Sequence, residues 1–198
     1  RIAGEIGEKG IQAVAISAVF SPVNTEMENE AKLILEKELP DAHFSLSSDI
    51  GRVGLLEREN AAIMNACLRE LSDTTITAFR EALKQAGLSA NFYLTQNDGT
   101  LMSEKIARQF PVLTFASGPT NSMRGAAFLS GLKDAVVIDI GGTTTDVGAL
   151  QKGFPRQAGV AVEIGGVRTN FRMPDVFSIG LGGGSHVLGK AGDVQVGP

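Results

Sequence analysis

The eight residues from Asp139 to Asp146, DIGGTTTD, carry two carboxylates, two adjacent glycines and three threonines. Asp139 follows a run of β-branched residues, so we expect its carboxylate inside a strand that otherwise favours burial. Burying such a group costs several kcal/mol unless it is paired, hydrogen-bonded or close to a cation. Gly141 and Gly142 allow a tight turn whose N–H groups converge on an anion. The stretch therefore predicts a loop that holds a phosphate.

The remaining polar residues of this stretch extend the same chemistry. Thr143, Thr144 and Thr145 add hydroxyl groups able to bond phosphate oxygens or metal-bound water. Asp146 offers a hard oxygen ligand of the kind that Mg²⁺ accepts, often through water. A plain β-hairpin with a Gly-Gly turn and threonine-rich strands is the alternative. It explains the glycines and threonines but not Asp139, and the spacing alone leaves both interpretations open.

Glycine becomes dense in the second part of the chain. Of the 24 glycines, 17 lie at or after Gly118, between apolar pieces that resemble strands. Because glycine lets the backbone approach a ligand closely and adopt positive φ, this density indicates a site built from main chain. Flexible linkers are the less favoured alternative, since the sequence has no low-complexity tract.

The first 56 residues favour a β-α-β unit. Residues 11–20 form a short apolar run typical of a buried parallel strand. Thr25 and Glu28 have the spacing of a capping box, which predicts that a helix begins there. Residues 43–46 predict the next strand, and a right-handed crossover would make the two strands parallel.

Helical spacing dominates residues 57–87. The pattern predicts two helices in series, with a break near Ser72 and Asp73 and an end at Gly87. Strands are expected at residues 91–94 and 110–115. A small-residue helix is expected to begin at the Ser117-Gly118-Pro119 turn and to run to residue 132.

Composition limits the classes of function. With 18 basic and 22 acidic residues, a net charge of -4 and no basic block, the chain is not expected to bind nucleic acid or an anionic membrane. Its longest strongly apolar run is well short of the roughly 18 residues of a membrane span. A single cysteine, Cys67, in a helical stretch predicts a packed thiol and a reduced, cytoplasmic setting. The start at Arg1, without Met, favours a piece of a longer protein.

Three isolated polar residues have structural interpretations that we prefer. His43 is expected to be a satisfied or surface histidine. His186 follows a glycine triplet and could touch a ribose or base, although a structural role is favoured. Arg58 is expected to form an ion pair at a helix start, worth under about 1 kcal/mol.

Seven stretches, in chain order, resemble the hydantoinase/oxoprolinase family of the hydantoin utilization protein A or N-methylhydantoinase A type. They are AVAISAVFSPVNTEMENEAKLIL, SLSSDIGRVGLLEREN, NACL, YLTQNDGTLMS, FPVLTFASGPTNSMRGA, VVIDIGGTTTDVGAL and SIGLGGGS. Within them, DIGGTTTD looks like the second phosphate loop of the superfamily of ATPases that includes actin, Hsp70 and sugar kinases.

The resemblance implies an α/β chain with an incomplete actin/Hsp70/sugar-kinase-like (ribonuclease H-like) ATPase fold. Residues 1–56 would end the N-terminal lobe, and residues 57–198 would form part of the second lobe, with a phosphate loop at 136–150 and a glycine segment at 180–185. The implied activity is ATP-dependent hydrolysis of a cyclic amide of the hydantoin or 5-oxoproline class. A second hydantoinase subunit of the B type is the implied partner.

The resemblance also assigns site residues. Asp139 and Asp146 would lie at the β- and γ-phosphates, hold Mg²⁺ and be the catalytic candidates. The residues implied to bind ATP are Gly141, Gly142, Thr143, Thr144, Gly182, Gly183, Gly184 and Ser185. The helix that begins at Ser117 would direct its first N–H groups toward an anion near the cleft.

Two turns depart from the family's usual pattern. The chain has SGPTNS where the family tends to have SGPAGG, and QNDGT in place of SNGG, which puts Asp98 near the turn expected on the substrate side. The family's first phosphate loop is not in this sequence, so the chain alone is not expected to complete a turnover. A small-molecule kinase of the same superfamily and a non-catalytic nucleotide-gated module stay open as alternatives.

Overall fold

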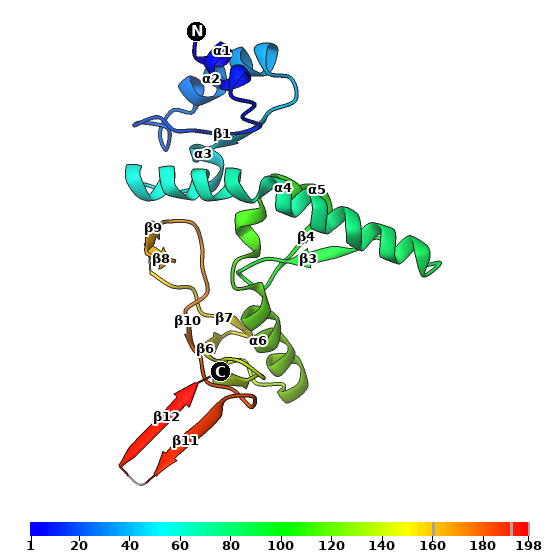
Figure 1. The fold of residues 1–198 in the computed structure, drawn as a ribbon, viewed down its shortest axis with the longest axis vertical. Coiled ribbons are helices and arrows are strands. Elements are labelled where there is room, and N and C mark those ends of the chain that lie inside the picture. Colours follow the sequence, from blue (N-terminus) through cyan, green and yellow to red (C-terminus); the bar gives the residue numbers. More distant parts are fainter. Residues whose placement is uncertain (160, 191, 198) are drawn as a thin grey trace. The chain divides into compact units, whose positions relative to one another are not determined.

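The computed structural model describes residues 1–159, 161–190 and 192–197, which form mixed α/β structure (Figure 1). They group into two compact units. Unit 1 takes its residues from 1–94, 101–115 and 160–171, and unit 2 from 95–100, 116–159 and 172–198. No helix in the described part is long and apolar enough to cross a bilayer. The lobe boundary expected near residue 57 stays a prediction.

Unit 1 opens with the predicted β-α-β arrangement. After helix α1 (Ile2–Glu8), strand β1 (Ala13–Ile16) pairs in parallel with β2 (His43–Leu46), and helix α2 (Glu26–Glu38) connects them. The parallel pairing is confirmed. The first strand is shorter than expected and only partly buried. The capping box is wrong, because the Thr25 side chain makes no cap hydrogen bond.

A single long helix replaces the two expected in series. After the short helix α3 (Ser47–Ile50), α4 runs unbroken through Leu55–Gln85. The hydroxyl of Ser72 donates to the Ala107 carbonyl at 3.1 Å, and Asp73 pairs with Arg108 at 3.0 Å. The two residues that suggested a break instead join this helix to a neighbouring one. Cys67, expected in the core, is exposed on α4.

The rest of unit 1 consists of short elements. They are β3 (Tyr93–Thr95), whose last residue groups with unit 2, β4 (Leu101–Ser103), α5 (Glu104–Gln109), the 3-10 helix η1 (Pro111–Thr114), β8 (Val162–Ile164) and β9 (Val167–Thr169). Ile76, Met102 and Ala107 form a small buried core among them. The strand predicted at residues 110–115 is wrong, because Pro111 has no N–H for a ladder and begins a helical turn.

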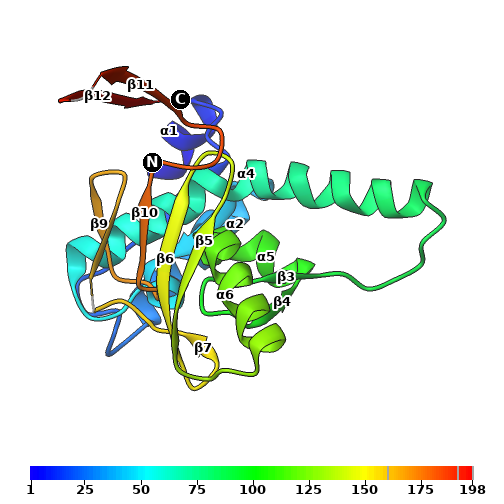
Figure 2. The same ribbon diagram turned by 90° about the horizontal axis from the view of Figure 1, so that it is seen from below.

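Unit 2 is built around an antiparallel sheet. Its elements are α6 (Ser117–Ser130), β5 (Ala135–Ile140), β6 (Thr145–Gln151), β7 (Phe154–Pro155), β10 (Val176–Ile179), β11 (His186–Lys190) and β12 (Asp193–Gly197). The strand order is β10-β6-β5, with β7 paired to β6, and β11 and β12 form a separate hairpin. Figure 2 shows β10, β6 and β5 side by side with α6 next to them. A Cβ on Gly148 of β6 would lie 2.5 Å from the Met123 sulfur, so the sheet and α6 are closely packed there.

A buried carboxylate connects the β-α-β unit to the residues after β2. Glu28 is fully buried, and its oxygens accept hydrogen bonds from the hydroxyls of Ser21 (2.6 Å), Ser47 (2.5 Å) and Ser48 (2.7 Å). The backbone N–H groups of Ala18 (2.9 Å) and Ser48 (3.0 Å) also donate to it. Burial raises the pKa of Glu28, but these hydrogen bonds outweigh burial and bring the pKa below its ordinary value of 4.5.

A buried arginine completes this network. Arg58 is 1% exposed and donates from Nε to the Ser47 hydroxyl at 2.9 Å and from its terminal nitrogen to the Ala18 carbonyl at 2.6 Å. Ser47 therefore lies between the guanidinium and the Glu28 carboxylate. The expectation of a surface ion pair at the helix start is wrong: Arg58 is buried and bonds mainly to backbone carbonyls.

Asn170 holds the turn that leads into α4. It is 1% exposed, accepts from the Arg52 N–H at 3.1 Å and donates to the Arg52 and Val53 carbonyls at 3.1 Å. A Cβ on Gly51 would lie 2.7 Å from the Asn170 side-chain oxygen, so the turn has room only for glycine. The side chain thus supplies the polar partners that this part of the backbone would otherwise lack.

We expect Glu28→Gln to remove most of this network's contribution to stability. The pKa of Glu28 is lowered in the folded state, so its stabilisation is full above pH 4.5 and is lost as pH falls through the folded-state pKa. Gln lacks the charge and presents an N–H₂ group to the same donors, which should cost about 2–4 kcal/mol at pH 7. Urea unfolding over a pH series measures both effects.

Glu30→Gln, an exposed position on the same helix, is the matched control and should leave the free energy of unfolding nearly unchanged. A Glu28→Gln variant whose stability ran parallel to that of the wild type through pH 3 to 7 would contradict this account of the network.

Candidate functional site

The β-hairpin considered for DIGGTTTD is confirmed, and phosphate binding at its turn stays a prediction. β5 and β6 are antiparallel partners, with Asp139 opposite Asp146 and Ile140 opposite Thr145. The Gly141 N–H donates to the Thr144 carbonyl at 2.9 Å and closes the turn. Residues 141–144 are all exposed at the tip. The turn therefore projects from the end of the sheet.

A polar row crosses three strands next to this turn. Asp139 faces Asp146 across the β5–β6 pair, and Ser178 faces Asp146 across the β6–β10 pair. The Ser178 hydroxyl donates a hydrogen bond to Asp146. Like charges directly opposite each other on a sheet repel, and a bound cation removes that cost. Residue spacing alone did not predict Ser178, because only the pairing of β10 with β6 brings it beside Asp146.

The burial expected around Asp139 is wrong for this chain. Asp139 is partly buried, whereas its neighbours Val136 and Ile138 are 70% and 60% exposed. Strand β5 is at the edge of the sheet, and its side chains alternate between the face with Asp139 and an exposed apolar face. The argument for a cation rests instead on the opposed carboxylates.

Two glycine segments pack backbone against backbone at the tip. A Cβ on Gly182 would lie 2.7 Å from the Gly141 carbonyl oxygen and 2.8 Å from that of Gly142. A Cβ on Gly184 would lie 2.9 Å from the Gly142 oxygen. Real Cβ atoms do not approach this closely, so both positions require glycine for space.

The backbone N–H groups of residues 182–185, the second glycine segment, are all in use. The N–H groups of Gly183 and Gly184 donate to the carbonyls of Gly141 (2.9 Å) and Gly142 (2.7 Å). Gly182 N–H donates to the Ser185 hydroxyl at 3.0 Å, and Ser185 N–H returns to the Gly182 carbonyl at 3.0 Å. The segment therefore holds the turn rather than offering N–H groups of its own. Its role along a nucleotide stays a prediction.

The turn itself keeps unused donors. Within the described part of the chain, no hydrogen bond uses the backbone N–H of Gly142, Thr143 or Thr144. The expectation that the Thr145 hydroxyl faces a phosphate or metal-bound water is wrong, because Thr145 is buried and its hydroxyl donates to the Leu181 carbonyl at 2.6 Å. Exposed N–H groups on a backbone fixed from behind form a typical anion-binding arrangement.

Two of the residues that depart from the family pattern, Thr120 and Asp98, have structural partners. Buried Thr120 donates from its hydroxyl to the Ala116 carbonyl at 2.8 Å, and Ala116 has φ 55° at the start of α6. Asp98 accepts from the Thr100 N–H at 2.9 Å and the Thr100 hydroxyl at 2.6 Å, which closes the QNDGT turn. The roles of the α6 N-terminus and of this turn toward ligands stay predictions.

Asp139 and Asp146 could hold a metal only with help from water. In residues 1–159, 161–190 and 192–197, no three His, Cys, Asp or Glu side chains gather as metal ligands. Mg²⁺ usually takes one or two carboxylates and completes its shell with waters and substrate oxygens. Two opposed carboxylates with a neighbouring hydroxyl fit that requirement.

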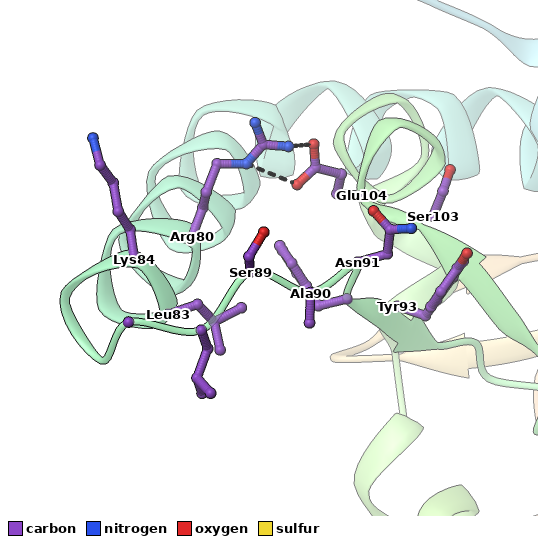
Figure 3. A pocket seen from close by; sticks show the side chains of 12 residues that line it. Arg80, Leu83, Lys84, Ser89, Ala90, Asn91, Tyr93, Ser103 and Glu104 are labelled. Carbon is purple, nitrogen blue, oxygen red and sulfur yellow. Dashed lines mark hydrogen bonds and ion pairs between the residues drawn. The ribbon is translucent and has the colours of Figure 1, made fainter.

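Unit 1 also has a cleft of about 730 Å³ between the end of α4 and residues 87–93 (Figure 3). Arg80 and Glu104 lie on its rim and form an ion pair with each other. The rest of the lining is mostly apolar or small, with Leu83, Ser89 and Ala90 among it. Arg80 and Glu104 neutralise each other, and Lys84 adds a further positive charge to the lining. The hairpin tip of unit 2 is the better candidate site, because it combines two opposed carboxylates with unused backbone N–H groups.

Two solved structures share the fold of this chain. An ATP-dependent caprolactamase from Pseudomonas jessenii superimposes with a TM-score of 0.78 at 25% identity, covering 98% of this chain and 29% of that one. A nucleotide-free acetone carboxylase gives a TM-score of 0.73 at 23% identity, covering 99% of this chain and 29% of that one.

The chain belongs to the hydantoinase/oxoprolinase family, whose sequence profile matches residues 58–198. Similar proteins include the acetophenone carboxylase gamma subunit of Aromatoleum aromaticum (27% identity, 96% of this chain) and the caprolactamase subunit alpha of Pseudomonas jessenii (26%, 96%). Another is 5-oxoprolinase 1 of Arabidopsis thaliana (27%, 96%). The chain spans 27%, 28% and 15% of these three relatives.

We expect Gly182→Ala to disrupt the packing behind the turn. The new methyl group would meet the Gly141 and Gly142 carbonyls, and relief of such overlap costs about 1–3 kcal/mol. Gly183→Ala is the matched control, because its Cβ would lie 3.8 Å from the Gly141 oxygen, an ordinary contact. Thermal unfolding and amide exchange at the β5–β6 turn measure the difference, and equal behaviour of the two variants would refute the packing argument.

Proposed function

We propose that this chain supplies the phosphate-binding half of an ATP-dependent enzyme that opens a cyclic amide. The observation that carries the proposal is the hairpin tip, where Asp139 and Asp146 face each other beside a turn with unused N–H groups. Family membership and the similarity to a caprolactamase and a 5-oxoprolinase support the choice of reaction.

In this proposal the residues of the tip have three roles: they bind the cation, bind phosphate and support the turn. Asp139 and Asp146 hold Mg²⁺, mainly through its waters, and Ser178 orients Asp146 by its hydrogen bond. The N–H groups of Gly142, Thr143 and Thr144 and the two threonine hydroxyls bind phosphate oxygens. Gly182, Gly183, Gly184 and Ser185 keep that turn in place from behind.

ATP, when bound, supplies a phosphoryl group that makes the amide carbonyl carbon more electrophilic. The chain's contribution is position and charge: fixed donors and a cation stabilise the negative charge that develops on the phosphate oxygens. The group that activates water is expected elsewhere in the protein or in a partner subunit. The names of two relatives describe them as subunits, gamma and alpha, which supports such a partner.

ATP-dependent carboxylation of a ketone is a second candidate function. It is favoured by the acetophenone carboxylase gamma subunit, which matches 96% of this chain at 27% identity. The same phosphate site serves both candidates, because each requires activation of an oxygen by ATP. The substrate decides between them.

The test uses the whole protein that contains this chain, together with its partner subunit. It is incubated with Mg·ATP and either cyclic amides (hydantoin, 5-oxoproline, caprolactam) or a ketone with bicarbonate. We expect amide-dependent phosphate release with a ring-opened product, and a loss of kcat of about 10²-fold or more in Asp139→Asn and Asp146→Asn. Asp193→Asn, an exposed carboxylate of β12, is the control and should keep full activity.

Each alternative gives a different result. Product formed only from the ketone and bicarbonate selects the carboxylase, and a stable phosphorylated small molecule selects a kinase. Binding of Mg·ATP without any product selects a nucleotide-gated module. If Asp139→Asn and Asp146→Asn retained wild-type affinity for Mg·ATP and wild-type turnover, the assignment of the phosphate site itself would be wrong.

A further inference from the structure

A second charged cleft lies in unit 1, apart in the sequence from the hairpin tip. It has a volume of about 600 Å³ and is lined by α2, β2, α4 and α5. Five basic side chains reach it, against three acidic ones. The basic residues are Lys32, His43, Arg69, Lys105 and Arg108, and the acidic residues are Glu36, Asp73 and Glu104.

The three carboxylates of the cleft already have cationic partners. Glu36 pairs with Lys32 at 3.5 Å, and Asp73 pairs with Arg108 at 3.0 Å. Glu104 pairs with Arg80, which lies outside the cleft. Among the residues that the structure describes, no ion pair involves Arg69 or Lys105. Two positive charges are therefore left without a direct carboxylate partner.

Arg69 is poorly satisfied in its present position. Its Nε is buried and has no hydrogen-bond partner in the described part of the chain, and one terminal nitrogen lies 3.4 Å from His43 Nδ1. A buried donor without an acceptor costs about 1–3 kcal/mol. Burial lowers the pKa of Arg69, an effect that the nearby Asp73 charge only partly offsets. An oxyanion that drew the guanidinium toward the cleft would supply both the missing acceptor and the missing charge.

We propose that this cleft binds a small dianionic oxyanion between Arg69 and Lys105. A charge of -2 matches the two uncompensated cations, and the guanidinium favours ligands with two oxygens in one plane, such as a phosphate group or a dicarboxylate. His43 lies beside Arg69 and donates or accepts at the edge of the same site. The site does not involve the hairpin tip, and it stands whether or not the proposed ATP-dependent reaction does.

The test measures how fast an amine-reactive reagent acetylates individual lysines, read by mass spectrometry on the whole protein. Inorganic phosphate and succinate, each at millimolar concentration, are compared with sodium chloride at the same ionic strength. We expect phosphate or succinate to slow acetylation of Lys105 by about tenfold, while Lys84, in the cleft of Figure 3, is unaffected. Arg69→Gln should abolish the protection, and Arg52→Gln, at an exposed arginine that does not line the cleft, should preserve it.

The outcomes separate the proposal from simple charge screening and from misfolding. Protection by phosphate alone or by succinate alone identifies which dianion the cleft takes. Equal protection by chloride, equal protection of Lys84, or protection that persists in Arg69→Gln overturns the proposal. Arg69→Lys retains the positive charge and should retain part of the protection. If Arg69→Gln lost protection only because it unfolds, its melting temperature would be lower than that of the wild type.

Discussion

The close approach of two glycine backbones determines the form of the candidate site. Gly182 lies so near Gly141 and Gly142 that a single methyl group would overlap their carbonyls. That approach lets Gly183 and Gly184 donate to the carbonyls of Gly141 and Gly142, while the N–H groups of residues 142–144 stay exposed. A loop of small residues alone would be mobile. Hydrogen bonds from the second glycine segment give this loop a fixed shape without adding any side chain that would obstruct an anion.

A buried network of charged and hydroxyl side chains fixes the segments around α4 in unit 1. Glu28 and Arg58 are both buried, and the Ser47 hydroxyl accepts a hydrogen bond from Arg58 and donates one to Glu28. Neither charge is left without partners, which is the condition for burying charges at acceptable cost. Because the partners come from the residues after β1, after β2 and within α4, the network fixes several loops at once. An apolar core of the same size would not specify those loop conformations.

Local sequence patterns predicted the elements whose partners lie nearby in the chain. The parallel pair on either side of α2 and the hairpin around Gly141 follow from apolar runs and turn residues over short distances. Ser72 and Asp73 misled because their true partners, Ala107 and Arg108, lie on another helix. For the site, the turn could be predicted from DIGGTTTD, but Ser178 and the packing of Gly182 depend on strand pairing and loop contact, which residue spacing does not encode.

The chemistry available at the hairpin tip also explains why relatives with different reactions can share this portion of the chain. Its groups are N–H donors, hydroxyls and two carboxylates, all of which suit phosphate and a hydrated cation. In the role proposed above, this part of the chain determines the use of phosphate but not the choice of substrate. An acetophenone carboxylase subunit and a caprolactamase subunit match this chain with nearly equal identity, 27% and 26%, as expected if substrate selection lies in other parts of those proteins.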